Sequence, residues 1–299
     1  MGAFILIADL LNASVGGDTT AQSVVRYLAE KGISRAAIGD EHLKALYSAL
    51  SKSAHTSLGR GIQVLEFNAI YKPVDDAVWG VIVETREHPS LEYVVCQFSN
   101  QLDIGIQLFH GKANESFIRG SKISSLIEQG KVILTPLDVE TFSLEEYNAL
   151  FLSKRFWNVQ MGRKKILVFQ ADAVLCERSD YQLTDFLYFD YIGSKWPRMR
   201  PAGMIIDGGN GGLSLRDLHK SVECLNRFPA ELWPGGEDGY FAFHMDLMGA
   251  RIGRNDECAR FSTQYEFLYR SFAGHSVTQL EPSSLDRFIQ YCPEVKHTL

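Results

Sequence analysis

The chain has 299 residues, of which 45% are hydrophobic and 22% are charged, a composition typical of a folded globular protein and not of a disordered chain. Its formal net charge of −6 provides no basic face for a duplex, so we expect no nucleic-acid partner. At this length the chain holds one large domain, or one domain with a small appendage.

Residues 18–55 differ from the rest of the chain and are predicted to be helical. Apolar residues recur at helical spacing in two stretches, one at 24–28 and one at 43–50. We interpret both stripes as faces that pack on the main domain and not as a partner surface. The prediction is therefore a helical N-terminal extension over residues 1–70, followed by one domain over 71–299.

From about residue 76 the pattern changes to short apolar runs, rich in Val, Ile and Phe, that alternate with helical segments. Polar or glycine-containing turns bound these runs, as is typical of buried parallel strands. The sequence therefore predicts an α/β fold built on an open sheet, in which ligands sit beyond the carboxyl ends of the strands. The predicted strands are 78–83, 104–109, 132–134 and 166–169, and helices are predicted at 90–102 and 144–152.

Polar segments directly follow three of these strands and are the first candidates for a site. Asp172 is a single acid enclosed by two apolar stretches, two residues past a predicted strand. Desolvating a carboxylate is costly unless the group is paired or binds a metal, although an Asp that caps a turn would give the same pattern. The three segments are Glu84-Thr85-Arg86, His110-Gly111 and Gln170-Ala171-Asp172.

The second half of the chain has more glycine and several aromatic-rich segments, which we interpret as loops and mixed strands on an acceptor side. Four glycines occur in five positions at 208–212, where Gly211 and Gly212 would let a backbone approach a ligand closely. A plain hairpin turn is the alternative. Neither GxGxxG nor GxxxxGK nor GxSxG occurs, which disfavours dehydrogenases, nucleotide hydrolases and α/β-hydrolases.

Adjacent acids at Glu237 and Asp238 are flanked by glycine and aromatic residues. One carboxylate could accept a proton from an acceptor hydroxyl while its neighbour orients the sugar. A helix N-terminus, where acids are favoured by the helix dipole, would explain the same residues, and both interpretations can hold together. Aromatic faces commonly stack on sugar rings, so Trp196, Trp233 and Tyr240 are candidates for the acceptor side. His275 becomes a metal-ligand candidate only if a second ligand lies near it.

In this order the elements resemble the GT-A glycosyltransferases, with a DxD-like turn, a glycine-rich loop, an xED motif and a C-terminal His. More closely, the chain resembles an uncharacterised glycosyltransferase-like domain family over residues 76–275. The resemblance implies a GT-A-like α/β fold, with a Rossmann-like open-sheet half for the nucleotide sugar and a mixed acceptor half. The stretches that carry it are VIVETREHPSLEYVV, IQLFHG, ILVFQADAVLC, DYIGSKWP and GGNGGLSLR.

The resemblance also implies a role for each candidate residue. Asp172 and His275 would hold a divalent metal, Mn²⁺ or Mg²⁺, that bridges the diphosphate of a nucleotide-sugar donor. Asp238 would be the catalytic base, and Glu237 would hold the acceptor. The run WPGGED is similar to the WGGED run of inverting β-galactosyltransferases, which favours inversion. The donor side would further comprise Glu84, Thr85, Arg86, Gln170, Ala171, Gly211 and Gly212, with Trp196 and Trp233 on the acceptor side.

One residue departs from the pattern of these enzymes. The first acid of a full DxD is replaced by Gln170, so the motif reads QAD and one carboxylate is lost. Gln can still bond to ribose or phosphate, but metal binding could be weaker or dispensable. The leading prediction is an inverting hexosyl- or pentosyltransferase, and the alternative is a catalytically silent sugar- or nucleotide-binding module on the same fold.

The expected partners are a nucleotide-sugar donor and a glycan, glycoconjugate or small-molecule acceptor, with homo-oligomerisation left open. The five cysteines are dispersed without a CxxC pair, which favours a reducing compartment. The apolar run at 2–8 is too short to span a bilayer and lacks a basic leader region. We therefore expect a cytoplasmic protein without a membrane span. The alternative is a secretory-pathway protein with an anchor outside this chain, and two sequons, at Asn12 and Asn114, do not decide between them.

Overall fold

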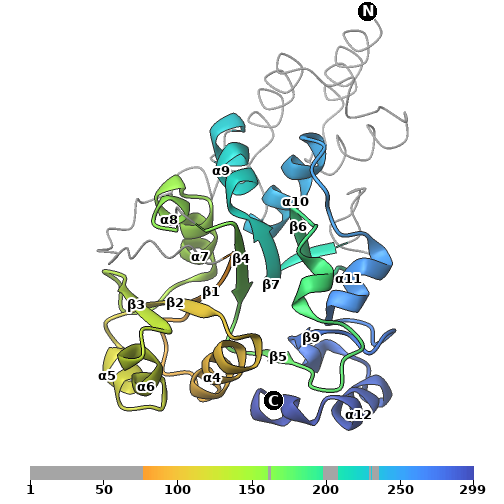
Figure 1. Ribbon diagram of the computed structural model, residues 1–299, viewed down its shortest axis with the longest axis horizontal. Helices are drawn as coiled ribbons and strands as arrows, with labels where there is room; N and C mark the ends of the chain where they lie inside the picture. The colour runs from red at the N-terminus through yellow and green to blue at the C-terminus, as the bar shows by residue number, and fades with distance from the viewer. Residues whose placement is uncertain (1–76, 161–162, 198–207, 229, 231–235) are drawn as a thin grey trace, which may run out of the picture.

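A computed structural model of the protein describes residues 77–160, 163–197, 208–228, 230 and 236–299 (Figure 1). The predicted helical extension over residues 1–70, its boundary with the following domain, and Trp233 lie outside these described residues. Among these described residues, none of the helices has the length and apolar character of a membrane span.

The centre of the fold is a six-stranded sheet in the order β3-β2-β1-β4-β7-β6. The first four strands in chain order run parallel to one another, whereas β7 pairs antiparallel with both β4 and β6. The predicted α/β class, with a Rossmann-like open sheet and a mixed second half, is therefore confirmed. The strands are β1 (Val78–Val83), β2 (Gly105–His110), β3 (Val132–Pro136), β4 (Lys165–Phe169), β6 (Tyr191–Lys195) and β7 (Gly208–Asp217).

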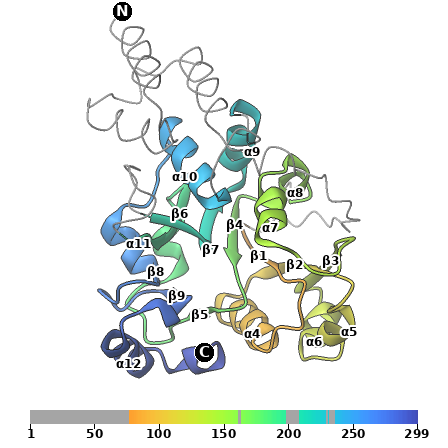
Figure 2. The same ribbon diagram turned by 180° about the vertical axis from the view of Figure 1, so that it is seen from behind.

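Apolar side chains cover both faces of the sheet, because successive strand residues point to opposite faces. In β1, for example, Val81 and Ile82 are fully buried in two different core clusters. Figure 2 shows the helices as two layers on opposite sides of the sheet. One layer holds α4 (Leu91–Leu102), α5 (Glu115–Arg119) and α6 (Ile123–Glu128); the other holds α7 (Leu144–Phe151), α8 (Lys154–Asn158), α9 (Leu218–Arg227) and α10 (Glu237–Leu247).

A second, three-stranded sheet in the order β5-β9-β8 lies next to the end of β4. Strand β5 follows β4 after a three-residue turn, and its antiparallel pairing with β9 places Ala173 opposite His275. This pairing brings two segments about one hundred residues apart in the chain to the same turn. The remaining elements are β5 (Ala173–Leu175), β8 (Ser262–Thr263), β9 (Ala273–His275), α11 (Asn255–Phe261), α12 (Pro282–Tyr291) and the 3₁₀ turns Leu183–Phe186, Val277–Gln279 and Pro293–His297.

Two segments predicted to be loops are strands instead. The glycine run lies inside β7, and most of segment 191–197 forms β6. The two strands approach so closely that a Cβ on Gly193 would lie 2.4 Å from the carbonyl oxygen of Asn210. Gly209 has a φ of +123°, which side-chain-bearing residues rarely adopt. Gly193 and Gly209 thus allow the two strands to pack closely. In the sequence, glycines with this role cannot be distinguished from glycines in a loop.

Candidate functional site

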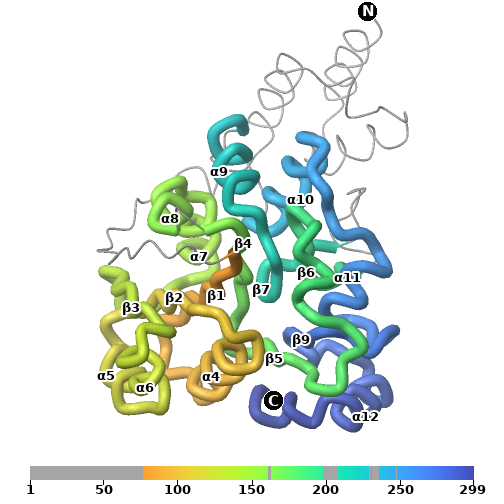
Figure 3. Tube along the Cα trace, viewed as in Figure 1, coloured from red at the N-terminus to blue at the C-terminus, as the bar shows by residue number. Residues whose placement is uncertain are grey.

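A pocket of about 390 Å³ opens at the carboxyl ends of β1 and β4. The chain runs outward from β1 to β2 and β3, then returns to place β4 on the other side of β1 (Figure 3). A change of direction of this kind is where open α/β sheets bind ligands. All six residues predicted from segments 84–86 and 170–172 line this pocket, together with Val83, His88, Phe142, Ser143, Leu144 and Tyr147.

Glu84 and Arg86 form a close ion pair on one wall of the pocket. Arg86 Nε donates to Glu84 Oε1 and Nη2 donates to Oε2, both at 2.8 Å. The Glu84 side chain is 6% exposed, whereas that of Arg86 is 65% exposed. The hydrogen bond with Glu84 raises the pKa of Arg86, while burial opposes the shift. Thr85 serves the wall itself, because its hydroxyl accepts the backbone N–H of Phe142 at 3.0 Å.

Asn114 supports this wall from behind, and the sequence analysis did not identify it as a site residue. Its Nδ2 donates to the carbonyl oxygens of Glu84 and Arg86, at 2.8 and 3.0 Å, and its Oδ1 accepts from Gly111 N at 3.0 Å. The side chain is fully buried. His110 and Gly111, which follow β2, are not among the residues that line the pocket. Of the two, Gly111 contributes through its bond to Asn114.

Asp172, which lines the pocket, meets His275, which is not among the lining residues, as the pairing of β5 with β9 requires. Asp172 Oδ1 lies 3.3 Å from His275 Nε2, and Gln170 Oε1 lies 3.1 Å from the same nitrogen. Ser276, with a φ of +48°, donates from Oγ to Asp172 Oδ2 at 2.6 Å. The sequence analysis did not single out Ser276.

The Asp172 carboxylate is strongly biased toward its ionised form. Burial alone would raise its pKa, but the neighbouring His275 and the hydrogen bond from Ser276 lower the pKa to about 2. Oδ1 of Asp172 is buried without a hydrogen-bond partner. A charged oxygen in this state is suited to a cation. Among the described residues, however, no three His, Cys, Asp or Glu side chains gather as a metal cluster, so Asp172 and His275 act as a pair.

Gly211 and Gly212 make room for protein side chains and not for an open ligand volume. A Cβ on Gly211 would lie 2.1 Å from Glu237 Oε1, and one on Gly212 would lie 2.0 Å from His275 Nε2. The backbone also joins the floor of the pocket, since Gly212 O accepts from Gln170 N at 2.9 Å. Gly211 and Gly212 therefore lie close to the site. The space beside them is filled by Glu237 and His275.

Glu237 is part of a buried ion pair and does not face a substrate. Its two carboxylate oxygens accept from Nη1 and Nη2 of Arg216 at 2.6 and 2.9 Å. Arg216 is fully buried and Glu237 is 3% exposed. The acceptor-binding role predicted for Glu237 is therefore corrected, because both oxygens are already bound. Aromatic rings surround the guanidinium at 5.2 to 5.7 Å: Phe151, Trp157, Tyr191 and Phe241.

Asp238 follows Glu237 in the first turn of α10 and is half-buried. Its Oδ1 accepts from Gly239 N at 2.7 Å and its Oδ2 from Gly211 N at 3.4 Å. Asp238 and His275 thus adjoin consecutive residues of β7, Gly211 and Gly212. Asp238 does not line the pocket itself but stands beside it.

The aromatic residues predicted for the acceptor side lie in the core. Trp196 is 4% exposed and Tyr240 is fully buried, both in the same apolar cluster. The hydroxyl of Tyr240 donates to the carbonyl oxygen of Phe228 at 2.8 Å. A buried ring cannot stack on a sugar, so the predictions for Trp196 and Tyr240 are wrong. Trp233 lies outside the described residues.

Two residues of α7 connect the pocket with α10, and the sequence analysis missed both. Tyr147 lines the pocket, as Gln170 does. Asn148 accepts the backbone N–H of Glu237 on Oδ1 at 2.9 Å. The only signal in the sequence was the Ser143-x-x-Glu146 capping box, which fixes the start of this helix and not its partners.

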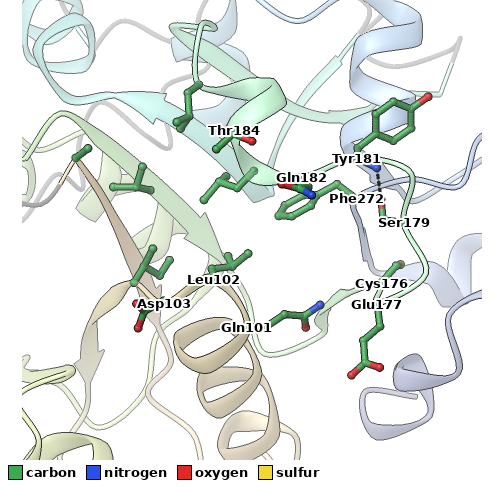
Figure 4. Close-up of a pocket in the computed structure, with 15 residues that line it drawn as sticks. Gln101, Leu102, Asp103, Cys176, Glu177, Ser179, Tyr181, Gln182, Thr184 and Phe272 are labelled. Atoms are coloured by element: carbon green, nitrogen blue, oxygen red, sulfur yellow. Dashed lines mark hydrogen bonds between the residues drawn. The ribbon is translucent and has the colours of Figure 1, made fainter.

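A second cavity, of about 580 Å³, lies at the amino end of β1 (Figure 4). The end of α4, with Gln101 and Asp103, faces the segment that contains Glu177 and Gln182 across it. Asp103 is largely exposed and paired with Lys131 at 3.1 Å. None of the predicted site residues lines this cavity.

The chain is similar to one protein family over part of its length and to several solved structures. Residues 131–276 match a family described as a protein of unknown function (DUF5672). No curated protein matches the sequence. A crystal structure of a proposed glucose-1-phosphate thymidylyltransferase from Bacillus anthracis, in complex with a sucrose, is similar at 15% identity and a TM-score of 0.41, over 60% of this chain and 86% of that one. The glycosyltransferase GlyE of Streptococcus pneumoniae TIGR4 is similar at 10% identity and a TM-score of 0.42, over 73% of this chain and 62% of that one.

Proposed function

We propose that the protein is a glycosyltransferase that moves a hexosyl or pentosyl group from a nucleotide sugar to an acceptor hydroxyl, with inversion at the anomeric carbon. The acceptor would be a glycan, a glycoconjugate or a small molecule, and residues 71–299 would form the transferase domain. The observation that carries the proposal is the convergence of segments 84–86 and 170–172 in one pocket, with His275 next to Asp172 and Asp238 bonded to the neighbouring strand β7.

The charges of the pocket support an anionic donor that arrives with a divalent cation. Glu84 and Arg86 neutralise each other, which leaves the ionised Asp172 facing the space where a diphosphate would sit. Two anions in contact repel, so a cation between them is required. The pocket volume of about 390 Å³ lies within the range of small-molecule sites.

The residues present fit one such cation. Asp172 Oδ1 is buried without a hydrogen-bond partner, and His275 Nε2 lies 3.3 Å from it. Asp172 and His275 would hold Mn²⁺ or Mg²⁺. The metal would supply charge neutralisation for the departing nucleoside diphosphate.

Asp238 is the proposed general base. Its half-buried carboxylate is held by backbone N–H groups, which orient it without protonating it. In a single displacement the acceptor hydroxyl attacks on the side opposite the leaving diphosphate, and a carboxylate there takes its proton. Asp238 accepts from Gly211 N, and His275 lies against Gly212, the next residue of β7.

A catalytically silent sugar- or nucleotide-binding module is the second candidate. The observation that favours it is that Gln170 Oε1 lies within hydrogen-bonding distance of His275 Nε2. Gln170 thus occupies the nitrogen that would bind a metal. Both candidates bind a nucleotide sugar, so only turnover separates them.

Thermal stabilisation of the full chain by UDP, GDP, CDP and dTDP, each with and without Mn²⁺, tests the binding step, because a ligand of the native state raises the apparent stability. We expect one nucleotide to stand out and to need the metal. Release of that nucleotide from its glucose or galactose conjugate then tests turnover. Binding without any turnover would establish the silent module, and no binding by any nucleotide would refute both candidates.

A further inference from the structure

We propose that Tyr147 recognises the transferred sugar, with its phenol donating a hydrogen bond to a hydroxyl group of the glycosyl unit. The inference rests on the proposed function and deepens it, because it assigns a residue to the sugar and not to the nucleotide. It arises from the position of Tyr147 between the two groups of residues that flank the reacting bond.

The first group lies on the donor side. Tyr147 lines the same pocket as Gln170 and Asp172. Its ring packs against that of Phe151, with ring centroids 4.8 Å apart. The contact with Phe151 thus fixes the Tyr147 side chain in the wall of the pocket that Gln170 and Asp172 also line.

The second group lies on the base side. Burial raises the pKa of Tyr147 most, the charges of Glu237 and Asp238 raise it further, and the charge of Arg216 opposes the shift. The next residue of α7, Asn148, accepts the backbone N–H of Glu237 at 2.9 Å. Gly236, which precedes α10, has no side chain to cap that helix. Asn148 takes over this function from α7, and so fixes Tyr147 relative to Asp238.

The proposed reaction determines what lies between these groups. In an inverting transfer the sugar has the departing diphosphate on one side and the attacking hydroxyl on the other. A side chain with Gln170 and Asp172 on one side and Asp238 on the other therefore faces the sugar. Tyrosine suits this place, because its ring offers an apolar surface and its hydroxyl a hydrogen-bond donor. Burial raises the pKa of Tyr147, so the phenol keeps its proton at neutral pH.

The test compares two probes on wild type and Tyr147→Phe, which removes only the hydroxyl. The probes are the nucleoside diphosphate that stabilises the wild type most and its glucose conjugate, both titrated calorimetrically with Mn²⁺. We expect the Kd of the nucleoside diphosphate to change less than twofold. The Kd of the conjugate should rise by about fivefold to twentyfold, the size of one lost hydrogen bond.

Tyr188→Phe is the matched control, because Tyr188 is 49% exposed and donates to Glu257 at 3.1 Å, away from the pocket. This control should leave both Kd values unchanged. A Tyr147→Phe variant that loses affinity for both probes equally, or for neither, overturns the inference while the proposed function stands. A wild type that binds neither probe overturns the proposed function and this inference with it.

Discussion

Arg216 on β7 and Glu237 at the start of α10 form a fully desolvated, two-point ion pair beside the pocket. The carboxylate belongs to the residue that precedes Asp238, so the pair fixes the first turn of α10 against the sheet. Because aromatic rings surround the guanidinium, loss of the carboxylate would leave its charge unpaired in apolar surroundings. The pair therefore holds the proposed base in position without taking part in the chemistry.

Glu237→Gln should destabilise the protein by about 3–5 kcal/mol, the usual cost of leaving one member of a buried ion pair uncompensated. Urea denaturation measures this change. Glu266→Gln is the control, since Glu266 pairs with Lys195 and is 46% exposed; it should cost less than about 1 kcal/mol. Normal stability in Glu237→Gln, with only a raised acceptor KM, would restore the acceptor-binding role rejected above.

Asp238→Asn keeps the shape and the hydrogen bonds of the side chain but removes its basicity. We expect kcat to fall by a factor of about 10²–10⁴, the usual worth of a positioned general base, with donor Kd unchanged. Steady-state kinetics and calorimetry of the same preparation measure the two quantities. Full activity in this variant removes Asp238 from the mechanism, and a product with retained anomeric configuration excludes inversion.

The two consecutive glycines of β7 should respond differently to a methyl group. In Gly212→Ala the new Cβ displaces His275 and Gln170, so metal-dependent donor binding should weaken by tenfold or more. In Gly211→Ala the Cβ presses on Glu237, so the main effect should be a loss of about 1–3 kcal/mol of stability. Measuring Kd and the urea midpoint for both separates the effects. Equal effects on Kd would show that the two positions serve the same group.

Ser276 should matter through its hydroxyl and not through its backbone. Ser276→Ala removes the hydrogen bond to Asp172 but keeps a side chain at a φ of +48°, whereas Ser276→Gly removes the bond and relieves the conformation. Both variants should weaken Mn²⁺-dependent nucleotide binding by about tenfold, the worth of one hydrogen bond to a charged group. Only Ser276→Ala should also lose stability. Unchanged binding in both variants would show that Asp172 needs no help from Ser276.

His244 predicts how stability depends on pH. Burial lowers its pKa to about 3, although a hydrogen bond to Tyr240 O opposes the shift. Below a pH of about 6.5 the unfolded chain takes up a proton that the folded chain refuses. Stability should therefore fall as the pH drops from about 6.5 to about 3, by about 2 kcal/mol at pH 5 relative to pH 8. Urea denaturation at both pH values should show a smaller difference in His244→Gln, and an equal difference would assign the pH dependence to other groups.

The half of the fold that contains β1 to β4 could be predicted because each residue there serves one purpose, either burial in a strand or a place at the end of a strand. Strands buried on both faces are continuous apolar runs, and the polar residues that follow them meet at one edge of the sheet. Segments 84–86 and 170–172 were found in this way, and the structure places all of them in one pocket. The mixed half was harder, because a glycine that admits a neighbouring strand and one that admits a ligand are identical in sequence.

The residues that support the site could not be predicted, since their partners are distant in the chain. Asn148 binds a backbone group 89 residues away, and Ser276 binds a carboxylate 104 residues away. Contacts between residues so far apart in the chain leave no periodic pattern in the sequence. The prediction for Trp196 was wrong for a related reason. An aromatic residue next to proline suits a sugar-binding surface and a core position equally well, and only its burial distinguishes the two.

Asn114 carries a consequence for the way in which this protein can be produced. It belongs to the sequon Asn114-Glu115-Ser116, yet its amide nitrogen is the atom that ties together the two carbonyl groups behind the Glu84–Arg86 wall. An oligosaccharide attached there would take that nitrogen and could not fit in its fully buried place. Modification by a secretory host and correct folding therefore exclude each other at this position. Ser116, whose side chain is exposed, is the residue at which the signal can be erased without touching the wall.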